Sequence, residues 1–466
     1  MPYDFDLICI GSGPAGQRAA IQAAKLGKRA AVVEKRREVG GACIDTGTIP
    51  SKTLREAVLQ VVQEARGPFA ERDGIRDQTP ITAERLLRRV DQTIRREQEV
   101  VEDQLRRNGV AILSGQGSFV DPHTIGVSRD RAEERHTTEF ALIAVGTNPA
   151  VPPGVTTDGE IVMTSDDIVN LKTIPKTMAV IGGGVIGIEY ASMFAQLGIA
   201  VTVIERRDRP LEFVDNEIVV ELAHQLRDRG ITFRLGETVA SITIENGASR
   251  RRAVILLESG KRVVADVALY SAGRSAATDG LGLDALGIAA GDRGKIVVDA
   301  AFRTSVPNVF AAGDVIGAPA LAATSAEQGR LAAREAFGVS CGPMPTHFPY
   351  GIYSIPEISM VGPTERELTA AKVPYETGVA RYREIARGQI LGDDSGFFKM
   401  IFHAETRKLL GVHVMGTHAT ELVHIGQAVL ALDGGLDYFL DTVFNYPTLA
   451  ECYKVAALNA ANKLSS

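Results

Sequence analysis

The chain has 466 residues, 45% hydrophobic and 23% charged, a balance typical of globular proteins rather than disordered or fibrous ones. A formal net charge of −6 provides no basic field for nucleic acid, and four cysteines are too few for a disulfide scaffold. No apolar run approaches the roughly 18 residues that span a bilayer, and the acidic first six residues lead straight into a predicted strand. We therefore expect a cytoplasmic protein, with no signal peptide, of about three ordinary domains.

The first recognisable unit is a strand, a glycine turn and a helix near the N-terminus. An apolar run at residues 7–10 is followed by the turn GSGPAG at 11–16, an Ala-rich helix to Lys25, and an apolar strand at 29–33 that precedes Glu34. This order is typical of dinucleotide binding, because the glycines let the backbone approach a pyrophosphate and the acidic residue binds a ribose. The candidate site residues here are Gly11, Gly13, Gly16 and Glu34.

The same pattern returns at Gly182, after an Arg- and Glu-rich stretch at residues 82–107 that predicts a helix with a solvated face. A predicted strand at residues 178–181 leads into the turn GGGVIG at 182–187, then a helix, then a strand that ends before Glu205. One chain with two dinucleotide folds is most simply a flavoprotein that exchanges electrons with a nicotinamide nucleotide.

Segments on either side of the second unit predict how it joins the first. Residues 141–147 precede it and residues 269–274 follow it, and we expect them to be paired crossovers, so that the second dinucleotide domain is inserted in the first. The first fold resumes at residues 304–314, which end in Gly313 and Asp314. A carboxylate there can bind a ribityl hydroxyl of a flavin, although an ordinary strand turn is an equal alternative on this segment alone.

The C-terminal part has a different pattern, without a nucleotide signature. Strands are predicted at residues 352–361, 397–402 and 409–414, with helices after Glu421 and Leu449. The predicted fold class is therefore α/β, with two Rossmann-like dinucleotide-binding domains, the second inserted in the first, and a C-terminal α+β domain. A C-terminal domain of this kind is suited to forming an interface between subunits.

Several short motifs together resemble the two-dinucleotide flavoprotein disulfide reductases, such as lipoamide dehydrogenase and glutathione reductase. They are GGAC at residues 40–43, IPSK at 49–52, AAGD at 311–314, PEI at 356–358, PT at 447–448 and Glu451, and the resemblance runs essentially end to end. It implies FAD bound by Gly11, Gly13, Gly16, Glu34, Gly313 and Asp314, and a nicotinamide nucleotide bound by Gly182, Gly184 and Gly187. It also implies a homodimer or higher homo-oligomer, and no metal.

The resemblance further implies an ion pair between Lys52 and Glu189 beside the flavin, where a cation would stabilise the charge of the reduced ring. Two unrelated surface charges are the alternative. The implied domains are an FAD-binding domain at residues 1–146 and 272–342, an NAD(P)-binding domain at 147–271 and a dimerisation domain at 343–466.

Two departures from the reductases indicate a different route for the electrons. The reductases carry Cys-x4-Cys, whereas here Cys43 is followed by Thr48 at the second position, and a hydroxyl cannot form an S–S bond. Their His before Pro-Thr is replaced by Tyr446, whose reference pKa of about 10 makes it a poor proton shuttle at neutral pH. The other cysteines, which offer no similar spacing, are Cys9, Cys341 and Cys452.

A second nicotinamide nucleotide is the simplest hydride acceptor, so we expect FAD-dependent transfer between NADPH and NAD by a ping-pong cycle without a redox disulfide, Si (B)-specific by resemblance. Glu205 suits the free ribose 2′-OH of NAD, and Arg206 with Arg207 could bind the 2′-phosphate of NADP. Arginines that face water are an equal alternative. Cys43 is either a thiolate that tunes the flavin or, as we favour, only a wall of its pocket.

Three other functions stay open. An NAD(P)H dehydrogenase that reduces a quinone or another diffusible acceptor uses the same flavin and needs no dithiol. A flavin-binding redox sensor that acts through partner association belongs to another class, and the retention of Lys52 and Glu189 disfavours it. A dithiol reductase that uses a distant cysteine ranks last.

Overall fold

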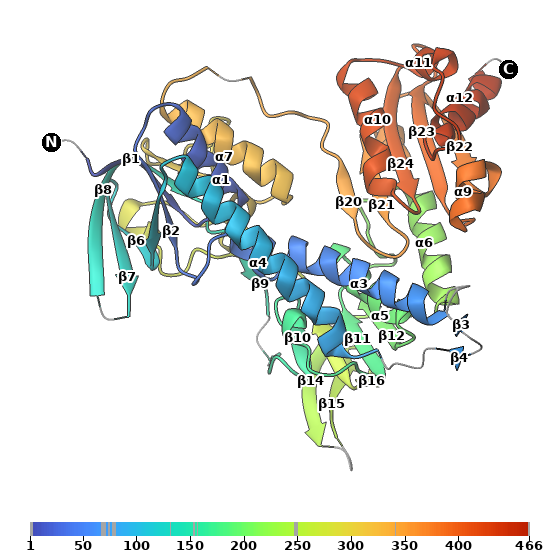
Figure 1. Ribbon diagram of the computed structural model, residues 1–466, viewed down its shortest axis with the longest axis horizontal. Helices are drawn as coiled ribbons and strands as arrows, with labels where there is room; N and C mark the ends of the chain where they lie inside the picture. Colours follow the sequence, from blue (N-terminus) through green and yellow to red (C-terminus); the bar gives the residue numbers. More distant parts are fainter. Residues whose placement is uncertain are drawn as a thin grey trace.

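The computed structural model describes residues 3–66, 71–72, 75–76, 81–130, 132–151, 154–155, 157–246, 250–340 and 342–464. Three regions surround separate sheets: the N-terminal region on the left of Figure 1, the middle region in green below, and the C-terminal region in red at the upper right. Two regions built on parallel sheets and a C-terminal region of an antiparallel sheet with helices confirm the predicted fold class.

The N-terminal region is built on a parallel sheet. Its strands, with an antiparallel extension, are β1 (Phe5–Ile10), β2 (Ala30–Glu34), β5 (Ala111–Ser114), β6 (Gln116–Asp121), β7 (Thr124–Arg129), β8 (Ala132–Ile143) and β19 (Val309–Ala311). The order is β5-β2-β1-β8-β7-β6, and β19 pairs in parallel with β8. All of β2 is buried, and its first four residues are a continuous apolar run, as expected for a parallel strand that is covered on both faces.

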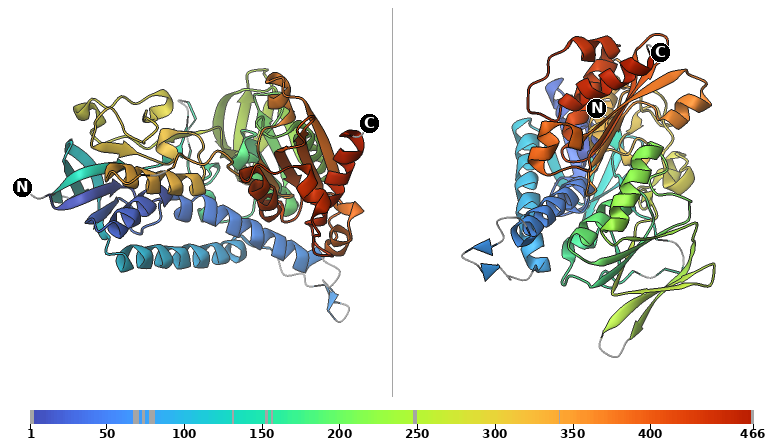
Figure 2. Two further views of the ribbon diagram at one scale, coloured as in Figure 1. Left: turned by 90° about the horizontal axis from the view of Figure 1, so that it is seen from above. Right: turned by 90° about the vertical axis from the view of Figure 1, so that its right-hand side faces the viewer.

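Helices cover this sheet and extend beyond it. They are α1 (Pro14–Lys25), α2 (Gly41–Asp45), α3 (Thr48–Arg66), α4 (Ala83–Arg107) and α7 (Ala322–Ala336). Helices α1 and α7 pack side by side, because Gly329 has no side chain and a Cβ there would lie 2.1 Å from the Ala15 carbonyl oxygen. Thr82 caps the predicted helix α4, which runs beside α3 (Figure 2).

The middle region holds the second parallel sheet. Its elements are β9 (Thr147–Pro149), β10 (Val162–Thr164), β11 (Thr177–Ile181), α5 (Val185–Gln196), β12 (Ala200–Glu205), α6 (Asn216–Asp228), β13 (Thr232–Leu235), β14 (Val239–Asn246), β15 (Arg251–Leu257), β16 (Arg262–Ala265), β17 (Val267–Tyr270) and β18 (Arg274–Ala276). The parallel order is β10-β17-β11-β12-β13, and β14-β15-β16 form an antiparallel sheet. The strands that join the two regions are β9 and β18, which pair with each other and share only Thr147 and Arg274 with the crossovers predicted at residues 141–147 and 269–274. After β18 the chain returns to the first sheet.

The C-terminal region is an antiparallel sheet of order β20-β21-β24-β23-β22 with helices around it. Its elements are β20 (Tyr350–Ile352), β21 (Ile358–Val361), α8 (Glu365–Ala370), β22 (Tyr375–Arg381), α9 (Ala386–Leu391), β23 (Phe397–His403), β24 (Leu409–Met415), α10 (Ala419–Ala431), α11 (Leu436–Asp441) and α12 (Glu451–Leu464). Short elements elsewhere are β3 (Glu71–Arg72), β4 (Ile75–Arg76) and the 3-10 helices Ile168–Asn170, Leu283–Leu286, Asp292–Gly294, Asp314–Ile316 and Tyr382–Glu384.

The single strand predicted at residues 352–361 is wrong. The structure has two short strands there, β20 and β21, which pair with each other across an irregular turn. Pro356 lacks an N–H, and the N–H groups of Tyr353 and Ile355 donate instead to Glu189 and Ser192 of α5. Among the described residues, no helix has the length and apolar character that crossing a membrane requires.

Candidate functional site

Two glycine turns of matching geometry begin helices α1 and α5. Gly11 has φ 105° and Gly182 has φ 108°, in the region that favours glycine. A Cβ at Gly16 would lie 1.9 Å from the Gly11 carbonyl oxygen, and a Cβ at Gly187 would lie 2.0 Å from that of Gly182. Only glycine therefore permits each helix to pack this closely against its own turn.

A buried carboxylate supports each turn. Oε2 of Glu34 accepts hydrogen bonds from the backbone N and the Oγ of Ser12, at 3.2 and 2.5 Å. Oε2 of Glu205 accepts from the backbone N of Gly183 at 2.7 Å. In both carboxylates the other oxygen accepts from the backbone N–H two residues further along the chain. The two predicted ribose ligands therefore occupy equivalent places in the two regions.

A cavity of about 640 Å³ opens on the first of these turns, within the size range of small-molecule sites. Its lining brings together Gly11, Gly13, Glu34, Cys43, Lys52, Glu189, Gly313 and Asp314 from the predicted site. Gly16 packs behind the first turn, and the residues outside this lining are Gly182, Gly184, Gly187, Glu205 and Arg206. Helix α5 connects the two places, since it begins at the second turn and carries Glu189 into the cavity.

Two parts of the cavity, the first glycine turn and the carboxylate of Asp314, are suited to binding FAD. A Cβ at Gly13 would meet no atom within 4 Å, so the turn faces open space that a pyrophosphate could fill. Burial raises the pKa of Asp314, while Ser325, which donates to it at 3.2 Å, and nearby Arg274 oppose that rise. Hydroxyl donors of a ribityl chain would satisfy such a buried carboxylate.

Lys52 and Glu189 form an ion pair at the cavity wall. Nζ of Lys52 lies 2.9 and 2.8 Å from the two carboxylate oxygens, and the side chains are 25% and 3% exposed. The same ammonium donates to Oγ of Ser51 at 3.3 Å and lies 5.0 Å from the ring centroid of Tyr353. The cation is thus held in one place between a carboxylate and an aromatic face.

Comparison with known protein families shows which family the chain belongs to. The family described as pyridine nucleotide-disulphide oxidoreductase matches residues 5–329, and its dimerisation domain matches residues 348–457. The chain belongs to the pyridine nucleotide-disulphide oxidoreductase family.

Relatives within this oxidoreductase family match along nearly the whole chain. A soluble pyridine nucleotide transhydrogenase of Mycobacterium bovis is 52% identical over 99% of this chain and 98% of its own length. One of Hahella chejuensis is 43% identical over 99% of both chains. Among solved structures, LpdA from Mycobacterium tuberculosis has a TM-score of 0.88 at 27% identity, covering 97% of this chain and 99% of its own. The HOCl-induced flavoprotein disulfide reductase RclA of Escherichia coli has a TM-score of 0.86 at 27% identity, with the same coverages.

Cys43 lines the cavity of this oxidoreductase, and its thiol is hydrogen-bonded to the side chain of Thr48. Burial raises the pKa of Cys43, and a hydrogen bond with the Thr48 side chain opposes that rise, so the thiol is protonated at neutral pH. Cys9 and Cys452 are buried and free, and burial raises the pKa of each. Cys341 lies outside the described residues. The described cysteines therefore place a lone thiol at the cavity.

The sequence interpretation missed Tyr353 and Ser12. Tyr353 reaches the cavity from the turn between β20 and β21, where it precedes the PEI motif but is not part of it. The position of Ser12 inside the first glycine turn could have indicated its contact with Glu34. Tyr446 is 68% exposed and is not part of the cavity lining, and Arg206 is exposed after β12.

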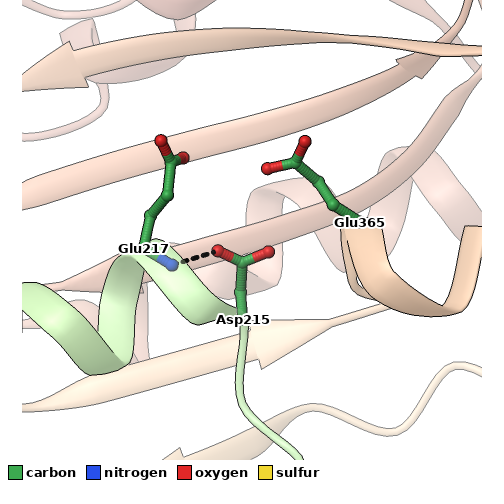
Figure 3. A group of neighbouring side chains, drawn as sticks. All are labelled: Asp215, Glu217 and Glu365. Carbon is green, nitrogen blue, oxygen red and sulfur yellow. Dashed lines mark hydrogen bonds between the residues drawn. The ribbon is translucent and has the colours of Figure 1, made fainter. Parts of the chain in front are cut away.

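Three carboxylates outside the cavity come close enough to hold a cation. Asp215 and Glu217 at the start of α6 face Glu365 of α8 (Figure 3). The Nζ of Lys399, a fully buried side chain of β23, lies 3.1 Å from Asp215 and 2.7 Å from Glu217, and contacts Glu365. Burial alone would lower the pKa of Lys399, but the three carboxylates raise it. This ammonium ties the middle region to the C-terminal region.

Proposed function

We propose that the chain is a pyridine nucleotide transhydrogenase that transfers hydride between NADPH and NAD, with FAD as its resident cofactor. The observation that carries this proposal is the pair Cys43 and Thr48, which puts a hydroxyl where a redox disulfide would need a second sulfur. Two relatives that are 52% and 43% identical carry the name soluble pyridine nucleotide transhydrogenase, which supports the same reaction.

FAD would supply a ring that accepts hydride from one nicotinamide nucleotide and returns it to another. In this proposal, the residues that hold the FAD are Gly11, Gly13, Gly16, Glu34, Cys43, Gly313 and Asp314. The residues that bind the nicotinamide nucleotide are Gly182, Gly184, Gly187, Glu205 and Arg206. Cys43 serves as a wall of the site.

Lys52 has an electrostatic role in the proposed reaction. Its ammonium, fixed by Glu189, provides positive charge at the cavity wall. Preorganised charge of this kind favours a transition state in which negative charge develops nearby. No proton transfer is required of Lys52, because a hydride moves as a unit between carbon and nitrogen atoms of the bound ligands.

The proposal includes finer features. Residues 1–146 with 272–342 form the FAD-binding domain, residues 147–271 the NAD(P)-binding domain and residues 343–466 the dimerisation domain. The active form is a cytoplasmic homodimer or higher homo-oligomer, and the transfer is Si (B)-specific. NADPH labelled with deuterium on the Si face should then lose its label on oxidation, and retention of the label in NADP would contradict this stereochemistry.

An acceptor panel with the purified yellow protein tests the main proposal. With NADPH as donor and oxygen excluded, an NAD analogue should be reduced much faster than a quinone, lipoamide or glutathione. Double-reciprocal plots at several acceptor concentrations should be parallel, as a ping-pong cycle in one pocket requires. Faster reduction of a quinone would favour the dehydrogenase alternative, and vigorous disulfide reduction would rule out a cycle without sulfur.

A further inference from the structure

The loop after β12 folds back onto the second glycine turn. The backbone N of Leu211 donates to the carbonyl oxygen of Gly183 at 2.9 Å. Leu211 itself is buried and has φ 46°, a conformation that non-glycine residues rarely adopt. These contacts fix the loop against the turn that is proposed to bind the nicotinamide nucleotide.

The next residue, Glu212, is held from two further directions. Its carbonyl oxygen accepts hydrogen bonds from Arg209 at 3.0 Å and from Arg366 of α8 at 2.8 Å. Asp215, three residues later, is bound by the buried Lys399. The backbone that carries Glu212 is therefore fixed by both the middle and the C-terminal regions.

The side chain of Glu212 holds a guanidinium beside the proposed ribose ligand. Nε of Arg207 lies 2.9 Å from Oε2 of Glu212, and its Nη1 lies 3.8 Å from Oε1 of Glu205. Glu205 is 5% exposed, whereas Arg207 and Glu212 are 43% and 52% exposed. A buried acid and an exposed acid thus share one cation. The neighbouring Arg206 is exposed and has no side-chain partner among the described residues.

We propose that Glu212 is a specificity-determining residue: it binds Arg207 when the nucleotide has a free 2′-hydroxyl, and the 2′-phosphate of NADP(H) displaces it. This inference rests on the proposed function, in which one pocket accepts both nucleotides in turn. A phosphate with two negative charges is a stronger, bidentate partner for a guanidinium than an exposed carboxylate is. An exposed ion pair contributes little, so its exchange opposes NADP binding only modestly.

Because Glu212 competes with the 2′-phosphate for Arg207, it reduces the difference between the affinities of the site for NAD and for NADP. With NAD bound, Glu212 neutralises Arg207, and Glu205 is available to the ribose 2′-OH. With NADP bound, Arg207 binds the 2′-phosphate, and the displaced Glu212 side chain is exposed to solvent. Without Glu212, the free guanidinium would favour the phosphorylated nucleotide more strongly.

Binding of two small fragments to the FAD-loaded protein tests the inference without depending on turnover. Isothermal titration with 2′,5′-ADP and 5′-AMP measures the affinities with and without the 2′-phosphate. Glu212→Gln should tighten 2′,5′-ADP by about two- to fivefold, the range expected for loss of one competing exposed ion pair, and leave 5′-AMP unchanged. The matched control is Asp208→Asn, because Asp208 is exposed in the same loop and contacts no charged partner among the described residues.

A double-mutant cycle separates displacement from simple charge repulsion. In an Arg207→Gln background, Glu212→Gln should no longer change the affinity for 2′,5′-ADP. The inference is overturned if the tightening persists without Arg207, or if Asp208→Asn produces it equally. Protein that binds both fragments as expected yet transfers no hydride to NAD would reject the proposed reaction while supporting the role of Glu212 in binding.

Discussion

The backbone N–H of Tyr353 donates to Oε1 of Glu189 at 2.9 Å, so the C-terminal region positions the carboxylate that holds Lys52. The ring of the same tyrosine lies over the Lys52 ammonium. One residue thus contacts both members of the ion pair, although it lies far from both in sequence. The charge at the cavity wall depends on contacts among all three regions of the chain.

Glu189→Gln should slow flavin reduction by NADPH by about a hundredfold while the protein keeps its FAD. The amide can still accept from Tyr353, but it no longer fixes a cation at the cavity wall. Stopped-flow absorbance of the flavin measures the rate. The control is Glu56→Gln on the Lys52 helix, where the carboxylate is 53% exposed and pairs with Arg55. Equal rates for Glu189→Gln and wild type would contradict an electrostatic role for the pair.

Cys43→Ser should retain most of the transhydrogenase activity, because the serine keeps the small polar wall beside Thr48 and no sulfur chemistry is needed. The assay is NADPH oxidation with an NAD analogue, normalised to bound FAD. Loss of nearly all activity with full FAD content would show that the thiol takes part in the reaction.

The reactivity of Cys43 should depend steeply on pH. Burial raises the pKa of this thiol, so the nucleophilic thiolate is scarce at pH 7, and alkylation by iodoacetamide should accelerate about tenfold per pH unit up to pH 9. Thr48→Val should slow alkylation at each pH, since it removes the hydrogen bond that lowers the pKa. Mass spectrometry of the Cys43 peptide follows the reaction. A plateau below pH 8 would be inconsistent with a raised pKa.

Lys399→Ala should reduce the free energy of unfolding by about 3–5 kcal/mol, because it leaves the buried carboxylate of Asp215 without its cation. The matched control is Lys408→Ala, which breaks the exposed pair with Asp433 and should cost less than about 1 kcal/mol. Urea unfolding at pH 7 compares the two variants. Similar losses for both would mean that burial adds nothing to the Lys399 contacts.

The second glycine turn should tolerate a methyl group at one position and not at another. Gly187→Ala places a Cβ 2.0 Å from the Gly182 carbonyl oxygen, so we expect a loss of about 1–3 kcal/mol in stability and loss of nucleotide binding. At Gly184, a Cβ meets no atom within 4 Å, so Gly184→Ala should fold normally. Thermal unfolding and titration with NADP distinguish the two variants, and equal stability would contradict the close packing at Gly187.

The features that could be predicted from the sequence are those that depend on residues close together along the chain. The two turns and the acids Glu34 and Glu205 follow one another within a short βαβ unit, so their order alone indicates their places. The absence of a second redox cysteine could also be predicted from the sequence, because Cys43 and Thr48 lie on one short segment. Thr82, as a side-chain cap, marks the start of α4 in the same local way.

The family resemblance gave one contact between distant segments, the ion pair of Lys52 with Glu189, but other long-range contacts were beyond such reasoning. The strand predicted at residues 352–361 is interrupted because the N–H groups of its central turn bond to α5 rather than to a neighbouring strand. The pairing of Arg207 with Glu212 depends on how the loop folds back through Leu211. Lys399 gives no sequence signal of burial, since its partners come from α6 and α8.

The lining of the large cavity extends along the chain from Ile10 to Tyr353. During synthesis on the ribosome, the glycine turn emerges early, but the wall that carries Tyr353 emerges only after three quarters of the polypeptide has been made. The complete pocket therefore cannot form on a short nascent chain. A translation product that stops before Tyr353 would lack that wall, so a flavin bound to it would be enclosed on fewer sides.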